Sequence, residues 1–233
     1  MIKAVFFDAA GTLFHLPRGV GYHYRVVAER LDCFIAESRW REAFGTAWKA
    51  MPARAATRTA RPDDDRGWWR ELVGRVLDHC RIPPAQLNPD AYFDELYAEF
   101  IQPGVWELFP EVRQVLATLR PRFRLALVSN FDGRLRPILA HLGVDQFFEH
   151  IVISSEVGAD KPDAWIFERA LELAGVTAKE AMHAGDDPVR DWQGAMAAGI
   201  HHFPLKRPTN SLRSILPMLD PPSGGGLKSR FVS

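Results

Sequence analysis

Cysteine is nearly absent from this chain of 233 residues, which contains only Cys33 and Cys80. Two cysteines are too few for a disulfide framework, and their spacing does not match that of a metal site. The sequence therefore excludes the class of small domains stapled by disulfides. It indicates a protein of a reducing compartment, and we expect the cytoplasm.

An excess of charge of one sign is lacking too, since 29 basic residues balance 29 acidic ones. Nothing in the net charge predicts nucleic acid or an anionic membrane as a partner. No apolar run reaches the length of about 18 residues that a membrane span needs, and the N-terminus lacks the basic region and cleavage site of a signal peptide. We expect no nucleic-acid and no membrane partner, so any affinity for anions must be local.

The first informative stretch runs from Ile2 to Phe14 and reads IKAVFFDAAGTLF. Its apolar run predicts a buried parallel strand that ends at Asp8, followed by a loop of small residues. In open α/β sheets, ligands bind beyond the carboxyl ends of the strands. Asp8 is therefore a candidate nucleophile or metal ligand, although a carboxylate in this position can also simply cap the next turn.

Residues from about 20 to 100 show a helical pattern. Apolar residues recur every three or four positions in segments 23–31, 38–51, 67–80 and 89–100, which predicts four helices and no strand. Since residues 2–7 alone cannot fold, we interpret this helical module as an insertion after the first strand. The adjacent Trp68 and Trp69 cannot both face one helical stripe, so one is a candidate for lining a cleft, although packing of both in the core is favoured.

A group of basic residues lies within the same module, namely Arg54, Arg58, Arg61 and Arg66. They form a candidate anion-binding patch. A solvated surface on which the acidic residues 63–65 offset their charge is the favoured interpretation.

From Pro110 onward, strands and helices alternate. Strands are predicted at 123–128, 150–154, 181–185 and 200–203, and helices at 110–119, 133–143, 163–175 and 188–199. Such alternation predicts an α/β fold whose parallel sheet includes the first strand. We expect a core of residues 1–15 and 104–216, an inserted helical domain of residues 16–103, and a tail of residues 217–233 that is flexible by its composition.

Residues suited to phosphoryl chemistry follow four of the five predicted strands. They are Asp8, then Ser129 and Asn130, then Lys161, and finally Asp186, Asp187 and Asp191. Parallel strands bring such positions to one edge of the sheet, where a carboxylate can attack phosphorus while Mg²⁺, lysine and hydroxyl groups stabilise the phosphoryl oxygens. Each residue alone has a structural explanation such as a helix cap. The prediction of a phosphoryl site therefore rests on their occurrence together after successive strands.

At these residues the sequence resembles the haloacid dehalogenase-like (HAD) hydrolase superfamily, over about residues 2 to 205. The four motif positions of the superfamily are occupied by FFDAAGT, LVSN, DKP and GDDPVRD. The helical insertion resembles its type-one cap, and the Trp-Trp pair together with SNFD at 129–132 is similar to one branch. The resemblance implies a Rossmann-like parallel-sheet core with an inserted α-helical cap.

The resemblance also implies a Mg²⁺-dependent phosphatase, a monomer or homodimer, that acts on a small phosphorylated metabolite through an aspartyl-phosphate on Asp8. Lys161 would belong to the catalytic site and temper repulsion among the acids. The phosphate would be bound by Gly11, Thr12, Ser129, Asn130 and Lys161. The ligands of Mg²⁺ would be Asp8, the carbonyl of Ala10, Asp186 and Asp191.

One position departs from the family pattern. Family phosphatases have a second aspartate two residues after the nucleophile, which protonates the leaving oxygen, and here that residue is Ala10. Loss of a general acid typically lowers the rate by a factor of about 10² to 10⁴. We therefore expect a slow enzyme, unless His15 or a residue of the cap supplies the proton.

Three alternatives stay open. Dehalogenases of the superfamily use no metal and lack the acid pair that Asp186 and Asp191 form here. Phosphonoacetaldehyde hydrolases share an alanine after the nucleophile and use a cap lysine as a Schiff base, but the only cap lysine here, Lys49, has a setting unlike theirs. The third alternative is a non-catalytic protein that binds phosphate or a partner.

Overall fold

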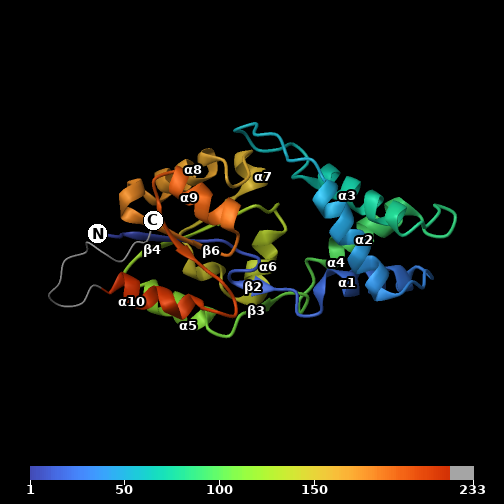
Figure 1. Cartoon of the computed structure of the whole chain (residues 1–233), viewed down its shortest axis with the longest axis horizontal. Helices are drawn as coiled ribbons and strands as arrows, with labels where there is room; N and C mark the ends of the chain where they lie inside the picture. The colour runs from blue at the N-terminus through green and yellow to red at the C-terminus, as the bar shows by residue number, and fades with distance from the viewer. Residues whose placement is uncertain (221–233) are drawn as a thin grey trace.

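The computed structural model describes residues 1–220 of the chain. A parallel sheet of five strands forms its centre, in the order β5-β4-β1-β6-β7 (Figure 1). The strands are β1 (Ala4–Phe7), β4 (Arg124–Ser129), β5 (His150–Ile153), β6 (Ala181–Gly185) and β7 (His201–Pro204). The predicted α/β class and parallel sheet are confirmed, and the first strand lies in the middle of the sheet.

Helices cover both faces of this sheet (Figure 1). One face packs against α5 (Val112–Leu119), α6 (Leu135–Leu142) and α10 (Leu216–Leu219), and the other against α8 (Ala164–Ala174) and α9 (Gly194–Ala197). Along β1, Val5 and Phe7 face the first set, whereas Ala4 and Phe6 face the second, and all four are completely buried. This burial on both faces explains why the strand reads as a continuous apolar run.

Several helices begin a few residues from the predicted position, among them α1 (Gly19–Arg30) and α6 (Leu135–Leu142). The α5 helix starts at Val112 rather than Pro110, with Glu111 at its N-cap. Segment 188–199 contains a π-helix, η3 (Pro188–Gln193), before α9 begins. The shorter helices are η1 (Asp145–Phe147), α7 (Ser154–Val157), η2 (Ala178–Glu180) and η4 (Leu212–Ile215). Of the tail predicted to be flexible, residues 217–219 belong to α10, and residues 221–233 lie outside the described part of the chain.

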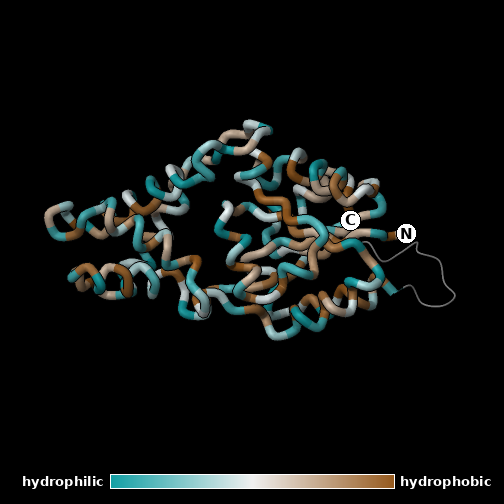
Figure 2. Tube along the Cα trace, turned by 180° about the vertical axis from the view of Figure 1, so that it is seen from behind, coloured by the Kyte–Doolittle hydropathy of each residue, from teal (hydrophilic) through white to brown (hydrophobic). Residues whose placement is uncertain are grey.

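The helical insertion forms a separate lobe, to the right in Figure 1. It consists of α1 (Gly19–Arg30), α2 (Glu37–Ala50), α3 (Arg66–His79) and α4 (Pro89–Glu99). Hydrophilic and hydrophobic residues mix along these helices, as the teal and brown segments of Figure 2 show. Their apolar sides pack around a core of their own, in which the rings of Trp40 and Tyr92 stack 5.6 Å apart. No helix within residues 1–220 combines the length and the hydrophobicity that crossing a membrane requires.

The two lobes are joined by a short antiparallel pair of strands, β2 (Phe14–His15) and β3 (Glu107–Leu108). Phe14 pairs with Leu108 and His15 with Glu107. The insertion therefore enters and leaves at one place. The sequence analysis did not predict β3, because two residues carry too little pattern to indicate a strand.

A second link between the lobes is the irregular segment 52–65, which connects α2 to α3 and which we call the strap. It reaches over to the core at the upper edge of Figure 1. The backbone N–H groups of Thr57 and Arg58 donate to the carbonyl of Gly158, at 2.8 and 3.1 Å, and that of Arg61 donates to the carbonyl of Ser155 at 2.8 Å. The strap therefore ties the cap to the core.

The expectation of a solvated arginine surface holds for Arg58 and Arg66, which are exposed, but it is wrong for the other two arginines of the group. The side chains of Arg54 and Arg61 are only 10% and 8% exposed. Both form ion pairs with Asp65 of the strap and with Asp160 of the core, at 2.9 to 3.4 Å. These arginines bind carboxylates of the protein itself, so they form neither a solvated face nor a free anion site.

Candidate active site

Three of the predicted site residues meet at the carboxyl edge of the sheet. Asp8 directly follows β1, Ser129 ends β4, and Asp186 follows β6. The parallel pairing of β1 with both β4 and β6 aligns these strand ends. The edge of the sheet thus carries a hydroxyl group and two carboxylates.

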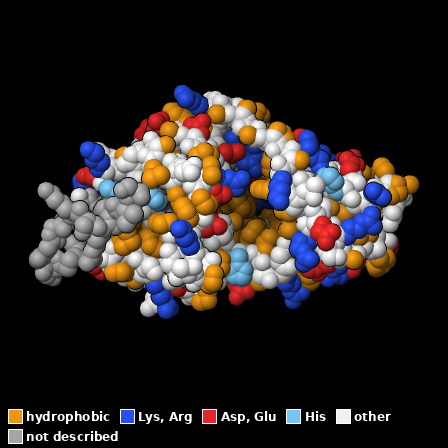
Figure 3. Space-filling view, in the orientation of Figure 1, with side chains coloured by type: hydrophobic (Ala, Val, Ile, Leu, Met, Phe, Trp, Pro, Cys, Tyr) orange, Lys and Arg blue, Asp and Glu red, His pale blue; other side chains and the backbone are white. Residues whose placement is uncertain are grey.

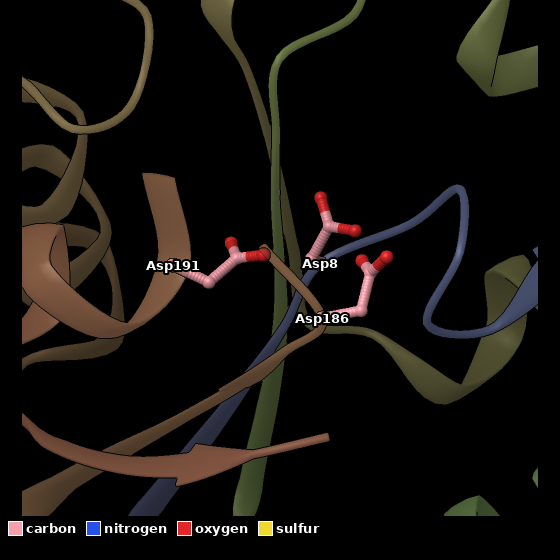
Figure 4. A group of neighbouring side chains, drawn as sticks. All are labelled: Asp8, Asp186 and Asp191. Carbon is pink, nitrogen blue, oxygen red and sulfur yellow. The ribbon is translucent and has the colours of Figure 1, made fainter. Parts of the chain in front are cut away.

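Asp8, Asp186 and Asp191 gather their carboxylates around one space (Figure 4), and one oxygen from each lies within 4.8 Å of the others. Asp8 and Asp191 are buried, whereas Asp186 is exposed. Gly11 makes the close approach of the first loop possible, because a Cβ there would lie 2.5 Å from Oδ2 of Asp186 and its φ is +90°. We call these three residues the acid cluster.

Lys161 is the counter-ion of the acid cluster. Its ammonium donates to Oδ1 of Asp8 at 2.7 Å and to Oδ1 of Asp191 at 2.6 Å, and the residue is only 3% exposed. Burial acts to lower the pKa of Lys161, but the two carboxylates outweigh it and raise the pKa above its ordinary value. The lysine is therefore held in its charged form.

Asn130 positions this lysine. Its Oδ1 accepts the backbone N–H of Lys161 at 2.6 Å, and its Nδ2 donates to the Lys161 carbonyl at 2.9 Å. Both the oxygen and the nitrogen of the Asn130 side-chain amide are therefore already hydrogen-bonded to the backbone of Lys161. The predicted contact of Asn130 with phosphate would compete with these two bonds. Ser129, which is 2% exposed, lines the same space as Asp8.

Two carboxylates of the acid cluster, Asp8 and Asp186, have raised pKa values. Burial raises the pKa of Asp8, an effect that Lys161 offsets only in part and that the charge of Asp191 increases. Asp186 reaches solvent, yet its partial removal from water and the charges of Asp8 and Asp191 raise its pKa to about 6. The acid cluster holds more negative charge than one lysine compensates.

His183 is a site residue that the sequence analysis missed. It is completely buried in β6, and its Nε2 lies 2.8 Å from Oδ1 of Asp191. Burial acts to raise the pKa of Asp191, but Lys161 and His183 outweigh it and hold that pKa well below its ordinary value. The available signal was a single polar residue within an otherwise apolar strand, AMHAG.

Gly11 and Thr12, which the resemblance predicts to bind phosphate, lie in the loop after β1. The Gly11 N–H donates to the Phe14 carbonyl at 2.8 Å, and the Thr12 N–H donates to the Ala9 carbonyl at 3.2 Å. The Thr12 hydroxyl donates to Oδ1 of Asp186 at 3.2 Å. Because these groups are used inside the loop, the two residues shape the loop and orient Asp186.

A cavity of about 350 Å³ opens beside the acid cluster, between cap and core. Figure 3 shows a hollow between the two lobes with hydrophobic atoms on its walls. Asp8, Ala10 and Lys161 line it on the core side. From the cap, Trp69 lines it, whereas the ring of Trp68 packs under the guanidinium of Arg54 at 4.2 Å and lies outside it. One tryptophan of the pair thus borders the cleft, as the sequence allowed, and both pack, partly buried, against the hydrophobic core of the cap.

No other acid near the nucleophile takes the place of the missing one. Asp187 lines the cavity, but its Oδ1 accepts the N–H groups of Val189 and Arg190, both at 2.8 Å, as a helix cap. Burial raises the pKa of Tyr97, another lining residue, to about 12. The ring centre of His15, in β2, lies 4.6 Å from that of Phe109. His15 is not among the described residues that line the cavity.

Comparisons with known proteins agree with this geometry. A sequence profile of haloacid dehalogenase-like hydrolases matches residues 2–199. The chain is 34% identical to the haloacid dehalogenase-like hydrolase domain-containing protein 3 of Mus musculus over 205 residues, which cover 87% of this chain and 81% of that protein. It is 40% identical to a phosphoserine phosphatase of Thermus thermophilus over 186 residues, which cover 77% of this chain and 73% of that protein.

Solved structures resemble the fold. YfnB from Bacillus subtilis, bound to magnesium, has a TM-score of 0.76 at 15% identity, covering 94% of this chain and 98% of that one. A HAD phosphatase from Thermococcus onnurineus has a TM-score of 0.66 at 21% identity, with the same coverage. These structures establish the fold alone, while the sequence profile spans most of the described chain. The protein belongs to the haloacid dehalogenase-like hydrolase family.

Proposed function

We propose that this protein is a Mg²⁺-dependent phosphatase that hydrolyses a small phosphorylated metabolite through an aspartyl-phosphate on Asp8. The observation that carries the proposal is a buried carboxylate, Asp8, paired with the ammonium of Lys161 at the edge of a cavity and beside two further acids. Membership in a hydrolase family and a phosphatase among the relatives support the reaction class. With both cysteines free and buried, the cytoplasm is the proposed location.

The donor set fits Mg²⁺, which prefers carboxylate and carbonyl oxygens. Lys161 pairs with Asp8 and Asp191, while partial burial and the charges of these two acids raise the pKa of Asp186 to about 6. The residues that would hold the ion are Asp8, Asp186, Asp191 and, through its carbonyl, Ala10. When bound, Mg²⁺ supplies positive charge that stabilises the phosphoryl oxygens in the transition state.

The side chains of Asp8, Lys161 and Ser129 have different roles in the proposed reaction. Lys161 holds Oδ1 of Asp8, which leaves Oδ2 as the attacking atom. Its attack forms a bond to phosphorus while the bond from phosphorus to the ester oxygen breaks, so an acyl phosphate remains and the alcohol departs. Water then attacks the acyl phosphate, releases inorganic phosphate and restores the carboxylate. Lys161 and the Ser129 hydroxyl are placed to bind the phosphoryl oxygens.

We expect this enzyme to be slow for alkyl esters. Ala10 lines the cavity next to the nucleophile and has no proton to give. The departing oxygen must leave as an anion or take its proton from water. A phosphate ester of a phenol, whose anion is stable, suffers less from this loss than an ester of an aliphatic alcohol.

The position of Lys49 argues against the phosphonoacetaldehyde hydrolase alternative. This lysine is exposed on α2 and is not among the described residues that line the cavity with Asp8. It lines a neighbouring pocket that also includes Asn130 and Lys161, so it borders the site without sharing the cavity of Asp8. The paired acids Asp186 and Asp191 likewise argue against a metal-free dehalogenase.

The test is Asp8→Asn against a matched exposed change, Asp145→Asn, with 4-nitrophenyl phosphate and Mg²⁺. We expect Asp8→Asn to abolish turnover in a variant that still folds, and Asp145→Asn, whose side chain is exposed, to behave as the wild type. Hydroxylamine should trap an acyl phosphate in the wild type and in Asp145→Asn but not in Asp8→Asn. Wild-type turnover by Asp8→Asn would remove the nucleophile assignment. Binding of phosphate without turnover of any phosphoester would favour the non-catalytic alternative.

A further inference from the structure

The walls of the cavity beyond the acid cluster are apolar, and we call this apolar part the chamber. Its side chains come from four cap helices or their ends and from the core, and include Val20, Phe44, Trp69, Val73, Phe100 and Phe131. The orange surface inside the hollow of Figure 3 corresponds to this part. A substrate whose phosphate lies at Lys161 would place its organic group here.

The chamber has few charges, and those that line it are already paired. The guanidinium of Arg134 binds both oxygens of Asp132, at 2.8 and 2.7 Å, and Asp132 is completely buried. The same guanidinium lies 3.7 Å from the ring centre of Tyr97. The other lining arginine, Arg190, is about half exposed and 3.9 Å from Asp187. A charged organic group would lose its water in the chamber, and the buried Arg134 is already bound to Asp132, which leaves only the half-exposed Arg190 as a cation held loosely.

The size of the cavity sets the size of the group. A cavity of about 150 Å³ takes up one benzene ring, so about 350 Å³ holds a phosphate together with one or two rings or an aliphatic chain of similar volume. We infer that the preferred substrates are phosphate monoesters whose organic group is uncharged and apolar, with about five to ten carbon atoms. This inference rests on the proposed phosphoryl site.

The closing experiment uses phosphonates, which bind without turning over, so the leaving group plays no part. Dissociation constants are measured by calorimetry with Mg²⁺ for orthophosphate and for methyl-, butyl- and hexylphosphonate. We expect affinity to rise about two- to fourfold per methylene, so that butylphosphonate, with three more methylenes, binds at least about eightfold more tightly than methylphosphonate. The probe 2-amino-4-phosphonobutanoate has the same carbon count as butylphosphonate but carries two charges, and it should bind at least about tenfold more weakly than butylphosphonate.

A matched pair of variants tests whether the alkyl chain of the phosphonate lies in the chamber. Phe44 lines the chamber and packs on Trp48 at 5.6 Å, whereas Phe34 is 73% exposed on the cap surface. Phe44→Ala should lower the ratio of hexyl- to methylphosphonate affinity by at least about threefold. Phe34→Ala should leave both that ratio and the affinity for orthophosphate unchanged.

The outcomes separate the two proposals. If orthophosphate and methylphosphonate bind but the series is flat, or if the charged probe binds as tightly as butylphosphonate, the apolar-substrate inference is refuted and the phosphoryl site stands. An equal ratio in Phe44→Ala and the wild type also refutes it. If Phe44→Ala does not fold, the wild-type series decides alone. If neither orthophosphate nor methylphosphonate binds, the proposed function fails and the inference fails with it.

Discussion

Lys161 offers the sharpest test of the electrostatics of the site, through the substitution Lys161→Met. Methionine is similar in length but carries no charge. The change removes a cation that is 3% exposed and hydrogen-bonded to Asp8 and Asp191 at 2.7 and 2.6 Å. Two carboxylates then remain in a buried site without their counter-ion.

Removal of one partner from a buried ion pair costs about 3 to 5 kcal/mol of unfolding free energy. In Lys161→Met part of this cost is relieved, because one carboxyl can keep its proton. The folded-state pKa of Asp8 is already raised above the unfolded value of 3.8, and loss of Lys161 raises it further. The folded variant therefore binds more protons than the unfolded chain. Its stability must fall as the pH rises from the unfolded value through the raised pKa, and must then level off.

The assay is urea unfolding of apo protein in EDTA, across a pH series, with Lys3→Met as the matched control. We expect a loss of about 3 kcal/mol for Lys161→Met above neutral pH, a smaller loss in mild acid, and partial recovery when Mg²⁺ is added. Lys3 is 63% exposed where it pairs with Glu180, so solvent screens that pair and the control should stay close to the wild type. A loss below about 1 kcal/mol at every pH would refute the view that Lys161 balances buried negative charge.

Three further predictions follow from the same geometry. Mg²⁺ affinity measured by calorimetry should fall as the pH is lowered through about 6, because the proton on Asp186 competes with the cation, and a pH-independent affinity would contradict this. Gly158→Ala should free the strap and speed its cleavage by trypsin, since the new Cβ would lie 2.0 Å from the Thr59 carbonyl, whereas Gly199→Ala, with a similar positive φ and its nearest atom at 3.6 Å, should not. Ala10→Asp should raise kcat/KM for cyclohexyl phosphate at least about tenfold and for phenyl phosphate less, and an unchanged cyclohexyl rate in a folded variant would mean that another group already supplies the proton.

The sheet and its reactive edge were predictable because their signals are local. The apolar run of β1 ends at Asp8, and polar residues follow the neighbouring strands at their ends. The strap was not predictable in this way. Arg54 and Asp160 are 106 positions apart, and nothing in either local sequence indicates the partner, so the arginines read as a solvated group. The roles of Asn130 and His183 were missed for the same reason, since each acts on a residue that folding alone brings near.

The chamber and Ala10 both affect the departure of the leaving group in the proposed reaction. Together they restrict the class of phosphate ester that we expect as substrate. An apolar chamber stabilises the organic group of a bound ester, but it also disfavours the charged oxygen that appears when this group departs. An acid at position 10 would relieve that conflict by protonating the oxygen, and Ala10 does not. The charge of the departing oxygen must then be spread within the leaving group itself, as in a phenolate. Of the apolar esters that fit the chamber, the aryl phosphates are those that both its walls and its missing acid favour.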